Sequence, residues 1–398
     1  MGPGAILPGA TLGIFGGGQL GRMTAMAART LGYHVLALDP DAACAARGVV
    51  DRCLCAAFDD PEAAAELGRA ADVVTLEIER VARHSLEAAA RHAPVRPGAA
   101  VLAVVQDRAV QKDWLAQHGF PVGPWRRADS AQELAEAAAA LGACFAKVRT
   151  GGYDGRGQAR LGVGEPTGPV WQALGQRPLV VEQALALAAE LSVLVARSPA
   201  GQTVVYPPAM NHHVDRVLDW SVLPGPLPEQ TAEEAMDMAR AIATALAVEG
   251  LLAVELFLTT QGRLLVNELA PRPHNTFHGT QLACLTDQFE QLVRAVCGLP
   301  LGAVAPVRPA AIVNLLGDLW LPAPDGQGGG PDYVAALQVE GVRLHLYGKG
   351  PPRPGRKMGH LSAVGSTPQE ALDRVLRARA RLARHPAPPP LAEVPPAR

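Results

Sequence analysis

The chain of 398 residues has little of what marks several common protein classes. Its 36 Lys and Arg nearly balance its 38 Asp and Glu, so the formal net charge of -2 gives no general attraction to nucleic acid or to an anionic membrane. No apolar run reaches the ~18 residues of a membrane helix, and the first ten residues lack the basic start and apolar block of a signal peptide. We therefore expect a cytoplasmic protein whose partners are small molecules, with no nucleic acid and no membrane among them.

Cysteine is scarce as well. The six cysteines are scattered, and the one close pair, Cys53 and Cys55, has CxC spacing rather than the paired CxxC of a zinc site, so we expect reduced core cysteines. The Walker A pattern GxxxxGK[ST] is absent, which excludes a P-loop. What is abundant is glycine and proline, 41 and 35 residues, and the 48% hydrophobic composition suits a globular protein of two or three domains.

Near the start, IFGGGQLGRM (residues 14–23) places Gly16, Gly18 and Gly21 in the spacing GxGxxG, and the next apolar run ends at Asp39. This resembles a dinucleotide-binding fingerprint, although an isolated GxGxxG fits many glycine-rich turns. Apolar runs at 11–15, 33–39 and 71–77 alternate with helix-like stretches, a pattern that predicts βαβ units and a parallel sheet. The first domain is therefore expected to be α/β.

Later segments indicate a change of fold. Ser130 and Glu133 are spaced as the capping box of a helix that Gly142 ends, and the runs from 144 to about 224 suggest mostly antiparallel strands. A long helix with Thr231 and Glu234 as its capping box follows. The Pro-rich stretch 300–309 has the composition of a linker, a helix begins at 367–368, and the tail from 386 cannot pack a core. We predict domains over 1–106, 107–299 and 300–385, with a disordered tail over 386–398.

Residues 146–158, AKVRTGGYDGRGQ, combine four glycines with Lys147, Arg149 and Arg156. Glycines let backbone N–H groups wrap phosphate oxygens while the cations neutralise their charge. The segment therefore indicates a phosphate-binding loop of a kind other than Walker A. A surface hairpin without a ligand is the alternative.

The hairpin LLAVELFLTTQGRLLVNEL (251–269) suggests a metal site. If 261–262 form a two-residue turn, Glu255 lies opposite Glu268 on one face of the sheet. Two carboxylates so close repel each other unless a cation lies between them, and magnesium prefers such oxygen ligands. The alternative is a register shifted by one residue, with one glutamate merely solvated.

Two basic clusters suggest a second phosphorylated ligand, because arginine binds phosphate through paired hydrogen bonds. One is APRPHNTFH (270–278), and the other is YGKGPPRPGRKMGH (347–360), although basic loops are often only solvated. A polar trio, NHH at 211–213, follows a strand and is well placed to line a cleft.

Taken in order, GGGQLGRM, DRAVQK, GGYDGRGQ, VEQ, NHH, NELAPRPHN and GRKMGH resemble the motifs of the ATP-grasp family, nearest to its 5-(carboxyamino)imidazole ribonucleotide synthases of purine biosynthesis. The resemblance runs from about residue 11 to 384. It implies an ATP-grasp fold, α/β with an α+β central part, in which a Rossmann-like domain precedes a grasp domain with a lid at 125–190 and a small β-rich C-terminal domain.

The resemblance also implies the nucleotide site. Phosphates would meet Arg108, Lys147 and the glycine loop, adenine would meet backbone at 182–185, and His213 would add a contact beside the ribose ligand Glu190. The residues so implied to bind ATP are Arg108, Lys147, Gly152, Tyr153, Asp154, Gly155, Arg156, Gly157, Gln158, Glu182, Gln183, Ala184, Leu185, Glu190, His213, Asn267 and Glu268. Glu255 and Glu268 would bind magnesium, in agreement with the hairpin pattern.

For the second substrate, aminoimidazole ribonucleotide, the resemblance implies contacts from Gln19, Tyr153, Asp154, Arg272, His274, Asn275, Lys349 and Arg356. Asp154, Lys147 and Arg272 would be the catalytic residues in an ATP- and bicarbonate-dependent carboxylation, and relatives imply a homodimer. The chain departs from the family pattern after His213, where Arg216, Val217 and Leu218, followed by Asp219, stand in place of a Gly-Ile-Leu-like step. That departure leaves the conformation of this loop, and the role of His213, open.

Three alternatives remain at this point. A formate-using ribonucleotide transformylase would share the ATP residues but not GRKMGH. An NAD-dependent oxidoreductase is supported by the first domain alone, and the resemblance implies that the glycine turn there lies near the substrate instead. A non-catalytic nucleotide-binding subunit conflicts with the presence of both acidic ligands and a candidate base.

Overall fold

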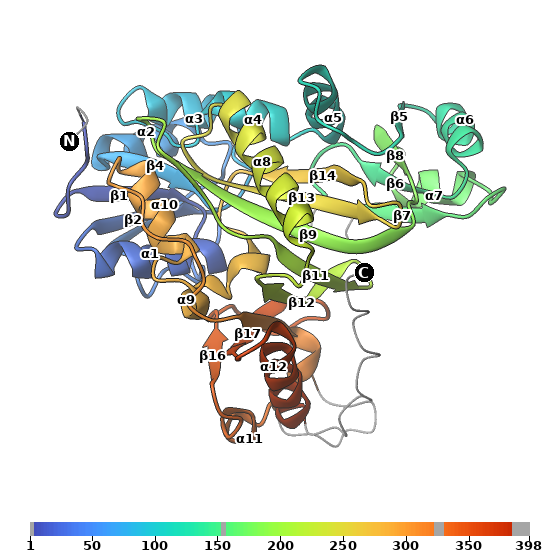
Figure 1. Cartoon of the computed structure of the whole chain (residues 1–398). Helices are drawn as coiled ribbons and strands as arrows, with labels where there is room; N and C mark the ends of the chain where they lie inside the picture. The colour runs from blue at the N-terminus through green and yellow to red at the C-terminus, as the bar shows by residue number, and fades with distance from the viewer. Residues whose placement is uncertain (1–3, 153–156, 322–329, 384–398) are drawn as a thin grey trace.

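The structure is a computed structural model that describes residues 4–152, 157–321 and 330–383 (Figure 1). Within these ranges the strands form three sheets: one parallel sheet of four strands, one antiparallel sheet of nine and one antiparallel sheet of four. No helix in the described ranges has the length and apolar character needed to cross a membrane. The mixture of α/β and antiparallel parts agrees with the predicted fold class.

The N-terminal region is a parallel sheet in the order β3-β2-β1-β4, with helices on both faces. Leu12 and Ile14 pack toward α1 and α10, while Phe15 packs toward α2, α3 and α4. Burial on both faces is why these strands are apolar runs. The elements are β1 (Thr11–Phe15), α1 (Gln19–Thr30), β2 (His34–Asp39), β3 (Arg52–Cys55), α2 (Pro61–Ala70), β4 (Val73–Leu76), α3 (Arg83–Ala90) and α4 (Ala99–Val105).

The nine-stranded sheet runs in the order β14-β13-β9-β11-β12-β15-β17-β16, and β10 pairs with β9. Its strands are β9 (Leu187–Arg197), β10 (Thr203–Val205), β11 (Ala209–Val214), β12 (Val217–Leu223), β13 (Gly250–Thr259), β14 (Leu264–Ala270), β15 (Ala310–Leu316), β16 (Val342–Leu346) and β17 (Lys357–Val364). Pairing of β12 with β15 means that the strands after residue 309 continue the sheet of the central region.

Helices cover this sheet at several places (Figure 1). Helix α8 packs on β9 and β13, α10 packs between that region and the N-terminal sheet, and α12 packs on β15 and β17. Their bounds, with the short helices, are α8 (Glu229–Ala245), η1 (Asn275–Phe277), α9 (Thr280–Ala283), α10 (Gln288–Val296), η2 (Gly317–Trp320), α11 (Tyr333–Leu337) and α12 (Pro368–Leu382).

The third sheet, in the order β5-β8-β6-β7, lies at the opposite end of the molecule from the N-terminal sheet (Figure 1). Ala146, Val148 and Leu179 pack on α6, so the alternate residues Lys147 and Glu182 point to the other face. The elements are α5 (Arg108–Gln117), β5 (Trp125–Ala128), α6 (Ala131–Leu141), β6 (Cys144–Val148), β7 (Gln158–Leu161), α7 (Gly168–Ala173) and β8 (Leu179–Gln183).

Most of the predicted helix starts are confirmed. The Ser130 hydroxyl accepts from the Glu133 N–H at 3.1 Å, and Thr367 caps α12 in the same way. The predicted start at Thr231 is wrong, because the Pro228 carbonyl already accepts from the N–H of Ala232 at 3.0 Å and α8 begins at Glu229.

The cysteine prediction holds in part. All six thiols are free, as expected, and Cys44, Cys144 and Cys297 are buried. Cys55 is exposed, so its assignment to the core is wrong. It ends β3, one of the two edge strands of the parallel sheet, in which only Leu54 is buried.

A column of three histidines joins the loop after β14 to the C-terminal strands. The ring of His360 on β17 stacks on His345 of β16 at 4.5 Å and on His278, after η1, at 4.6 Å. The Tyr347 hydroxyl is 2.8 Å from His360 Nδ1, and the Lys349 ammonium lies 5.3 Å from the centre of the Tyr347 ring. Burial lowers the pKa of His278 and His360 well below the usual value, with a further lowering by nearby His345 and, for His278, Lys357.

These two histidines predict an acid-sensitive fold. A histidine with a lowered pKa stays neutral when folded, whereas in the unfolded chain it takes up a proton below about pH 6.5. Stability should therefore decrease as pH falls below that value, by about 1.4 kcal/mol per pH unit for each histidine until its folded pKa is reached. Urea unfolding measured from pH 7.5 to 5 gives this slope. His278→Gln should flatten the slope relative to wild type, and an equal slope in both proteins would contradict the assignment.

Candidate active site

The two acidic residues predicted to bind metal face each other. Glu255 on β13 pairs with Glu268 on β14, so the prediction that the two residues lie opposite each other is confirmed. The two-residue turn on which it rested is wrong, because Thr259 N–H donates to the Arg263 carbonyl at 2.9 Å and residues 260–262 form a three-residue loop. Gly262 has φ +77°, as the last residue of such a loop requires.

A bulge restores the register. Between Glu255 and Leu256 the pairing shifts by one, so that Asn267 is an extra residue on β14. The amide of Asn267 donates to Glu255 Oε2 at 2.9 Å, so Asn267 and Glu268 both serve the same position of β13. Earlier on that face, Ala253 packs in the core shared with the N-terminal region, and Glu255 comes next beyond the edge of that core.

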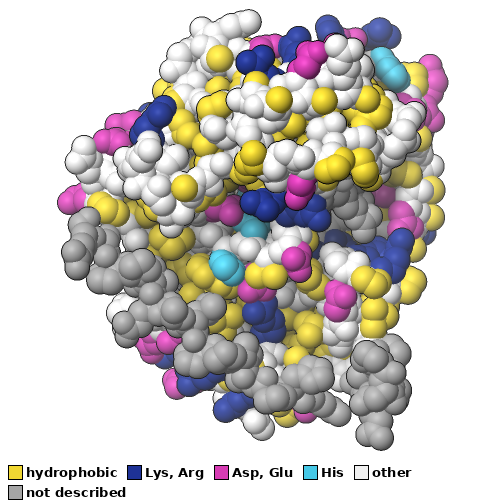
Figure 2. Space-filling model, turned by 90° about the vertical axis from the view of Figure 1, so that its right-hand side faces the viewer, with side chains coloured by type: hydrophobic (Ala, Val, Ile, Leu, Met, Phe, Trp, Pro, Cys, Tyr) yellow, Lys and Arg dark blue, Asp and Glu magenta, His cyan; other side chains and the backbone are white. Residues whose placement is uncertain are grey.

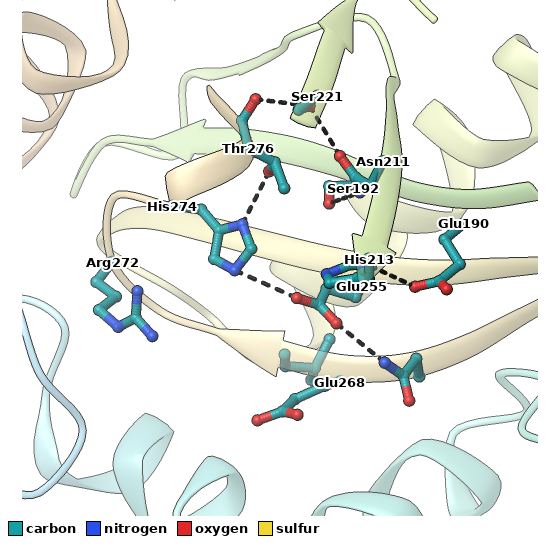
Figure 3. Close-up of polar contacts among 12 residues, drawn as sticks. Glu190, Ser192, Asn211, His213, Ser221, Glu255, Glu268, Arg272, His274 and Thr276 are labelled. Carbon is teal, nitrogen blue, oxygen red and sulfur yellow. Dashed lines mark hydrogen bonds and ion pairs between the residues drawn. The ribbon is translucent and has the colours of Figure 1, made fainter. Parts of the chain in front are cut away.

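Polar contacts hold Glu255 in its charged form (Figure 3). Its Oε1 is 3.3 Å from His274 Nε2, whose other ring nitrogen is 2.8 Å from the hydroxyl of Thr276. Burial would raise the pKa of Glu255, but hydrogen bonds from His274 and Asn267 and the nearby His213 outweigh it and lower the pKa. His213 Nδ1 in turn lies 2.8 Å from Glu190, which the resemblance assigns to ribose.

Glu268 pairs with the predicted phosphate ligand Arg108 at 2.6 Å. Arg108 is the first residue of α5, and it also donates to the Gly152 carbonyl at 3.3 Å, where the glycine loop begins. The pKa of Arg108 is raised, chiefly by Glu268. Asp107 caps the helix and binds Arg149 at 2.7 Å, so the end of β6 is tied to the start of α5.

Lys147 and Glu182 form an ion pair of 2.7 Å on the inner face of the third sheet. Burial alone would raise the pKa of Glu182, but the positive charges of Lys147, Lys112 and Arg108 outweigh burial and lower the pKa to about 2. The resemblance implies that backbone at 182–185 meets adenine, and within this stretch the N–H groups of Gln183 and Ala184 donate to the carbonyls of Pro124 and Ala143. The ion pair between the Glu182 side chain and Lys147 was not predicted from the sequence.

The glycine loop is described only at its ends. Tyr153, Asp154, Gly155 and Arg156, all predicted to contact substrates, lie outside the described residues. Gly157 accepts from the Val148 N–H at 2.8 Å, and Gln158 begins β7 opposite Lys147, so the loop leaves and rejoins the sheet beside that lysine.

Three of the predicted substrate residues meet although they come from three parts of the chain. The Gln19 amide donates to Asn275 at 2.9 Å, and its oxygen accepts from the Lys349 ammonium at 2.6 Å. Arg272 lies nearby in sequence and pairs with Glu79 at 2.7 Å. Arg356 is different, since its guanidinium donates to the Pro351 carbonyl in its own loop at 3.1 Å.

Glu77 explains the glycine-rich turn at residues 16–21. Its carboxylate, directly after β4, accepts from the N–H groups of Gly18 and Gly21, and Asp39 accepts from Gly17 at 2.7 Å. Burial raises the pKa of Glu77 despite these bonds. Because carboxylates occupy the donors that would bind the phosphates of a dinucleotide, the geometry argues against NAD. Acidic residues directly after a parallel strand were the available signal for this site.

The loop after His213 is a tight two-residue turn. Asp215 and Arg216 both have positive φ, +48° and +69°, and Val214 pairs with Val217. The Arg216 guanidinium donates to the Gln158 carbonyl at 2.8 Å. The departure from the family pattern therefore leaves His213 against Glu190, and it adds a contact to the end of the glycine loop.

The carboxylate pair fits a magnesium ion in its donor chemistry. Glu255 and Glu268 supply only oxygen donors, and each carboxylate has about four lone-pair sites, more than its present hydrogen bonds use. Among the described residues no group of three or more His, Cys, Asp or Glu is arranged to hold a metal ion. Two protein carboxylates completed by phosphate oxygens and water are the usual magnesium arrangement in nucleotide sites.

Lys, Arg and His side chains gather with acidic ones around a recess across the middle of the face drawn in Figure 2.

Family models match the chain in three successive parts: a ribonucleotide synthetase preATP-grasp domain over 9–106, an ATP-grasp domain over 113–289 and a phosphoribosylaminoimidazole carboxylase C-terminal domain over 310–374. Fold and site together define an ATP-grasp protein.

Individual relatives narrow the family. The N5-carboxyaminoimidazole ribonucleotide synthase of Brucella melitensis is 40% identical, with 90% of this chain and 98% of the relative covered, and that of Bacillus subtilis is 36% identical, with 93% and 95% covered. A crystal structure of an N5-carboxyaminoimidazole ribonucleotide synthetase in complex with ADP matches with a TM-score of 0.87 at 36% identity, over 95% of this chain and 98% of that one. The chain belongs to the N5-carboxyaminoimidazole ribonucleotide synthase family.

A further solved relative carries both ligand classes. The Aspergillus clavatus enzyme, in complex with ADP and 5-aminoimidazole ribonucleotide, matches with a TM-score of 0.84 at 28% identity, over 94% of this chain and 99% of that one.

Proposed function

We propose that this protein uses ATP and bicarbonate to carboxylate the exocyclic amine of 5-aminoimidazole ribonucleotide, with ADP and phosphate as the other products. The family and the complexes of its relatives with ADP and 5-aminoimidazole ribonucleotide support this reaction. We also propose magnesium as the cofactor, supported by the oxygen donors of the facing carboxylates and by the resemblance. The cytoplasm is the proposed location, and a homodimer is proposed from the resemblance alone.

One observation carries the proposal: the facing carboxylates lie between two sets of cations from different parts of the chain. On one side Arg108 contacts Glu268. Arg108 also lies close enough to Glu182, the ion-pair partner of Lys147, to lower the pKa of that carboxyl. On the other side Glu255 contacts His274. The next residue, Asn275, accepts a hydrogen bond from Gln19, which in turn accepts one from Lys349. Such an arrangement supports a triphosphate bound next to a second phosphorylated substrate.

The first step would be attack of bicarbonate on the γ-phosphoryl group to give carboxyphosphate and ADP. Magnesium, held by Glu255 and Glu268, would supply charge neutralisation on the phosphate oxygens. Arg108 and Lys147 would bind the phosphates and stabilise the charge that develops as the bond to the leaving group breaks. His213 and Glu190 would hold the nucleoside end.

Carboxyphosphate would then release carbon dioxide beside the ribonucleotide, whose amine captures it as a carbamate. Arg272, His274, Asn275 and Lys349 would orient that substrate by charge and hydrogen bonding. Asp154, in the segment outside the described residues, is the proposed acceptor of the amine proton.

A phosphate-release assay tests the proposal. With ATP and bicarbonate present, addition of 5-aminoimidazole ribonucleotide should stimulate phosphate release, and a chromatographic assay should show the acid-labile carboxyamino product. Formate in place of bicarbonate separates this reaction from that of a transformylase. Two results would contradict the proposed reaction: phosphate release stimulated with formate but not with bicarbonate, or a rate of phosphate release that does not change when the ribonucleotide is added.

A further inference from the structure

Lys112 is a buried lysine that the reaction scheme above does not use. It lies on the inner face of α5, with only 4% of its side chain exposed, and its ammonium is 3.2 Å from Glu182 Oε1. Burial lowers its pKa, and Lys147 and Arg108 act in the same direction, while Glu182 opposes them. A lysine is seldom buried to this extent without a strong reason, since removing an ammonium from water is costly.

The carboxylate of Glu182 is divided between two lysines. One oxygen faces Lys112 at 3.2 Å, and the other faces Lys147 at 2.7 Å. Glu182 itself is 12% exposed, so few water molecules can replace either partner. The two lysines come from different elements: Lys147 lies on β6 of the third sheet, and Lys112 lies on α5.

Helix α5 also reaches the other sheet. Arg108, one turn before Lys112, pairs with Glu268 on β14, and the Gln111 side chain accepts from the Leu269 N–H at 3.1 Å. Residues four apart on a helix lie on one face, so α5 presents one cation to β14 and one to β8. The helix therefore bridges the two sheets that flank the nucleotide in the proposed function.

The effect of Lys112 follows from how the Glu182 carboxylate is shared between the two ammonium groups. With one oxygen held by Lys112, Glu182 offers a single oxygen to Lys147, and the remaining hydrogens of the Lys147 ammonium can point to phosphate. Without Lys112 both oxygens would turn to Lys147, and a buried carboxylate with a single partner would bind it more strongly.

We propose that Lys112 is a positioning residue for the nucleotide site: by holding one oxygen of Glu182 it keeps the Lys147 ammonium available to the phosphates of ATP. The inference rests on the proposed function only in taking Lys147 as a phosphate ligand. It assigns to Lys112 an action through Glu182, without direct contact with the nucleotide.

A double-mutant cycle with ADP as the probe tests this. Lys112→Met, which keeps the length of the side chain, should raise the Kd for ADP about tenfold in calorimetry. In the Glu182→Gln background the same replacement should change Kd less than about twofold, because the carboxylate through which Lys112 acts is gone. The KM for ATP should rise in Lys112→Met while the KM for the ribonucleotide stays unchanged.

Arg127→Met is the matched control, because it removes one positive charge from an exposed position on β5 of the same sheet and should leave Kd unchanged. Equal effects of Lys112→Met in the two backgrounds, or none in wild type, would overturn the proposal. Should the single variant unfold, the double variant, which replaces the charged pair by neutral groups, is compared with Glu182→Gln alone. A Kd that differs more than about threefold between them would overturn the proposal, and a smaller difference supports it. The cycle uses no ribonucleotide, so it is independent of the phosphate-release test.

Discussion

Glu255→Gln should reduce ADP formation at saturating substrates by about 10²–10³-fold. Glutamine keeps the size of the side chain and can still meet His274 and Asn267, but it removes the charge that those contacts and His213 hold in place. In the proposed reaction that charge, with Glu268, would hold the magnesium ion that neutralises the phosphates. The rate of ADP formation, followed in a coupled assay with the ribonucleotide present, measures the loss.

The matched control is Glu233→Gln, which removes a carboxylate from the exposed face of α8 and should retain the wild-type rate. Thermal unfolding of both variants separates a loss of chemistry from a loss of fold. A Glu255→Gln enzyme with normal turnover would remove the paired-carboxylate site from the mechanism.

In the N-terminal sheet, the sequence predicted the strands that are mostly buried and missed the one that is mostly exposed. β1, β2 and β4 are apolar runs because helices cover both sides of the sheet at those positions. β3 has the sequence RCLC, and only Leu54 of its four residues is buried. It lies at one edge of the sheet, whereas β4 at the other edge is bridged through Val74 to Val95 and is buried at all four positions. A short and mostly exposed strand leaves no apolar run, so hydrophobic pattern alone does not reveal it.

The hairpin illustrates a prediction that was right although its premise was wrong. An assumed two-residue turn set the register that places Glu255 opposite Glu268, but the loop after Thr259 is one residue longer than assumed. The bulge at Asn267 compensates for that residue, and the pairing of Glu255 with Glu268 is restored. Periodicity reports faces, whereas turn length and bulges depend on backbone geometry that it does not encode.

Side-chain partners distant in sequence were the least predictable part of the site. Lys112 and Glu182 are separated by 70 positions, and although they stand in the motifs DRAVQK and VEQ, no local pattern pairs them. Gln19 and Lys349, 330 positions apart, were proposed as neighbours only through the family resemblance. Such contacts depend on how three sheets and α5 pack together, which no local pattern records.

Lys349→Met should raise the KM for the ribonucleotide about 10–100-fold, the range for loss of a hydrogen bond from a charged group. Its ammonium contacts Gln19, which in turn holds Asn275, on the side of Glu255 away from Lys147. The Kd for ADP should therefore remain within about twofold of wild type, because no nucleotide contact is proposed for this lysine. Steady-state kinetics with the ribonucleotide varied, together with ADP calorimetry, give both values.

Lys147→Met is the reciprocal test, since it should weaken ADP binding and leave the KM for the ribonucleotide nearly unchanged. Arg343→Met, an exposed cation on β16 close in sequence to Lys349, controls for the charge and should alter neither value. If Lys147→Met and Lys349→Met each weakened ADP binding and raised the KM for the ribonucleotide to the same degree, the carboxylate pair would not separate two binding regions. The crossed pattern is expected because Lys147 lies on the third sheet, whereas Lys349 follows β16 of the nine-stranded sheet.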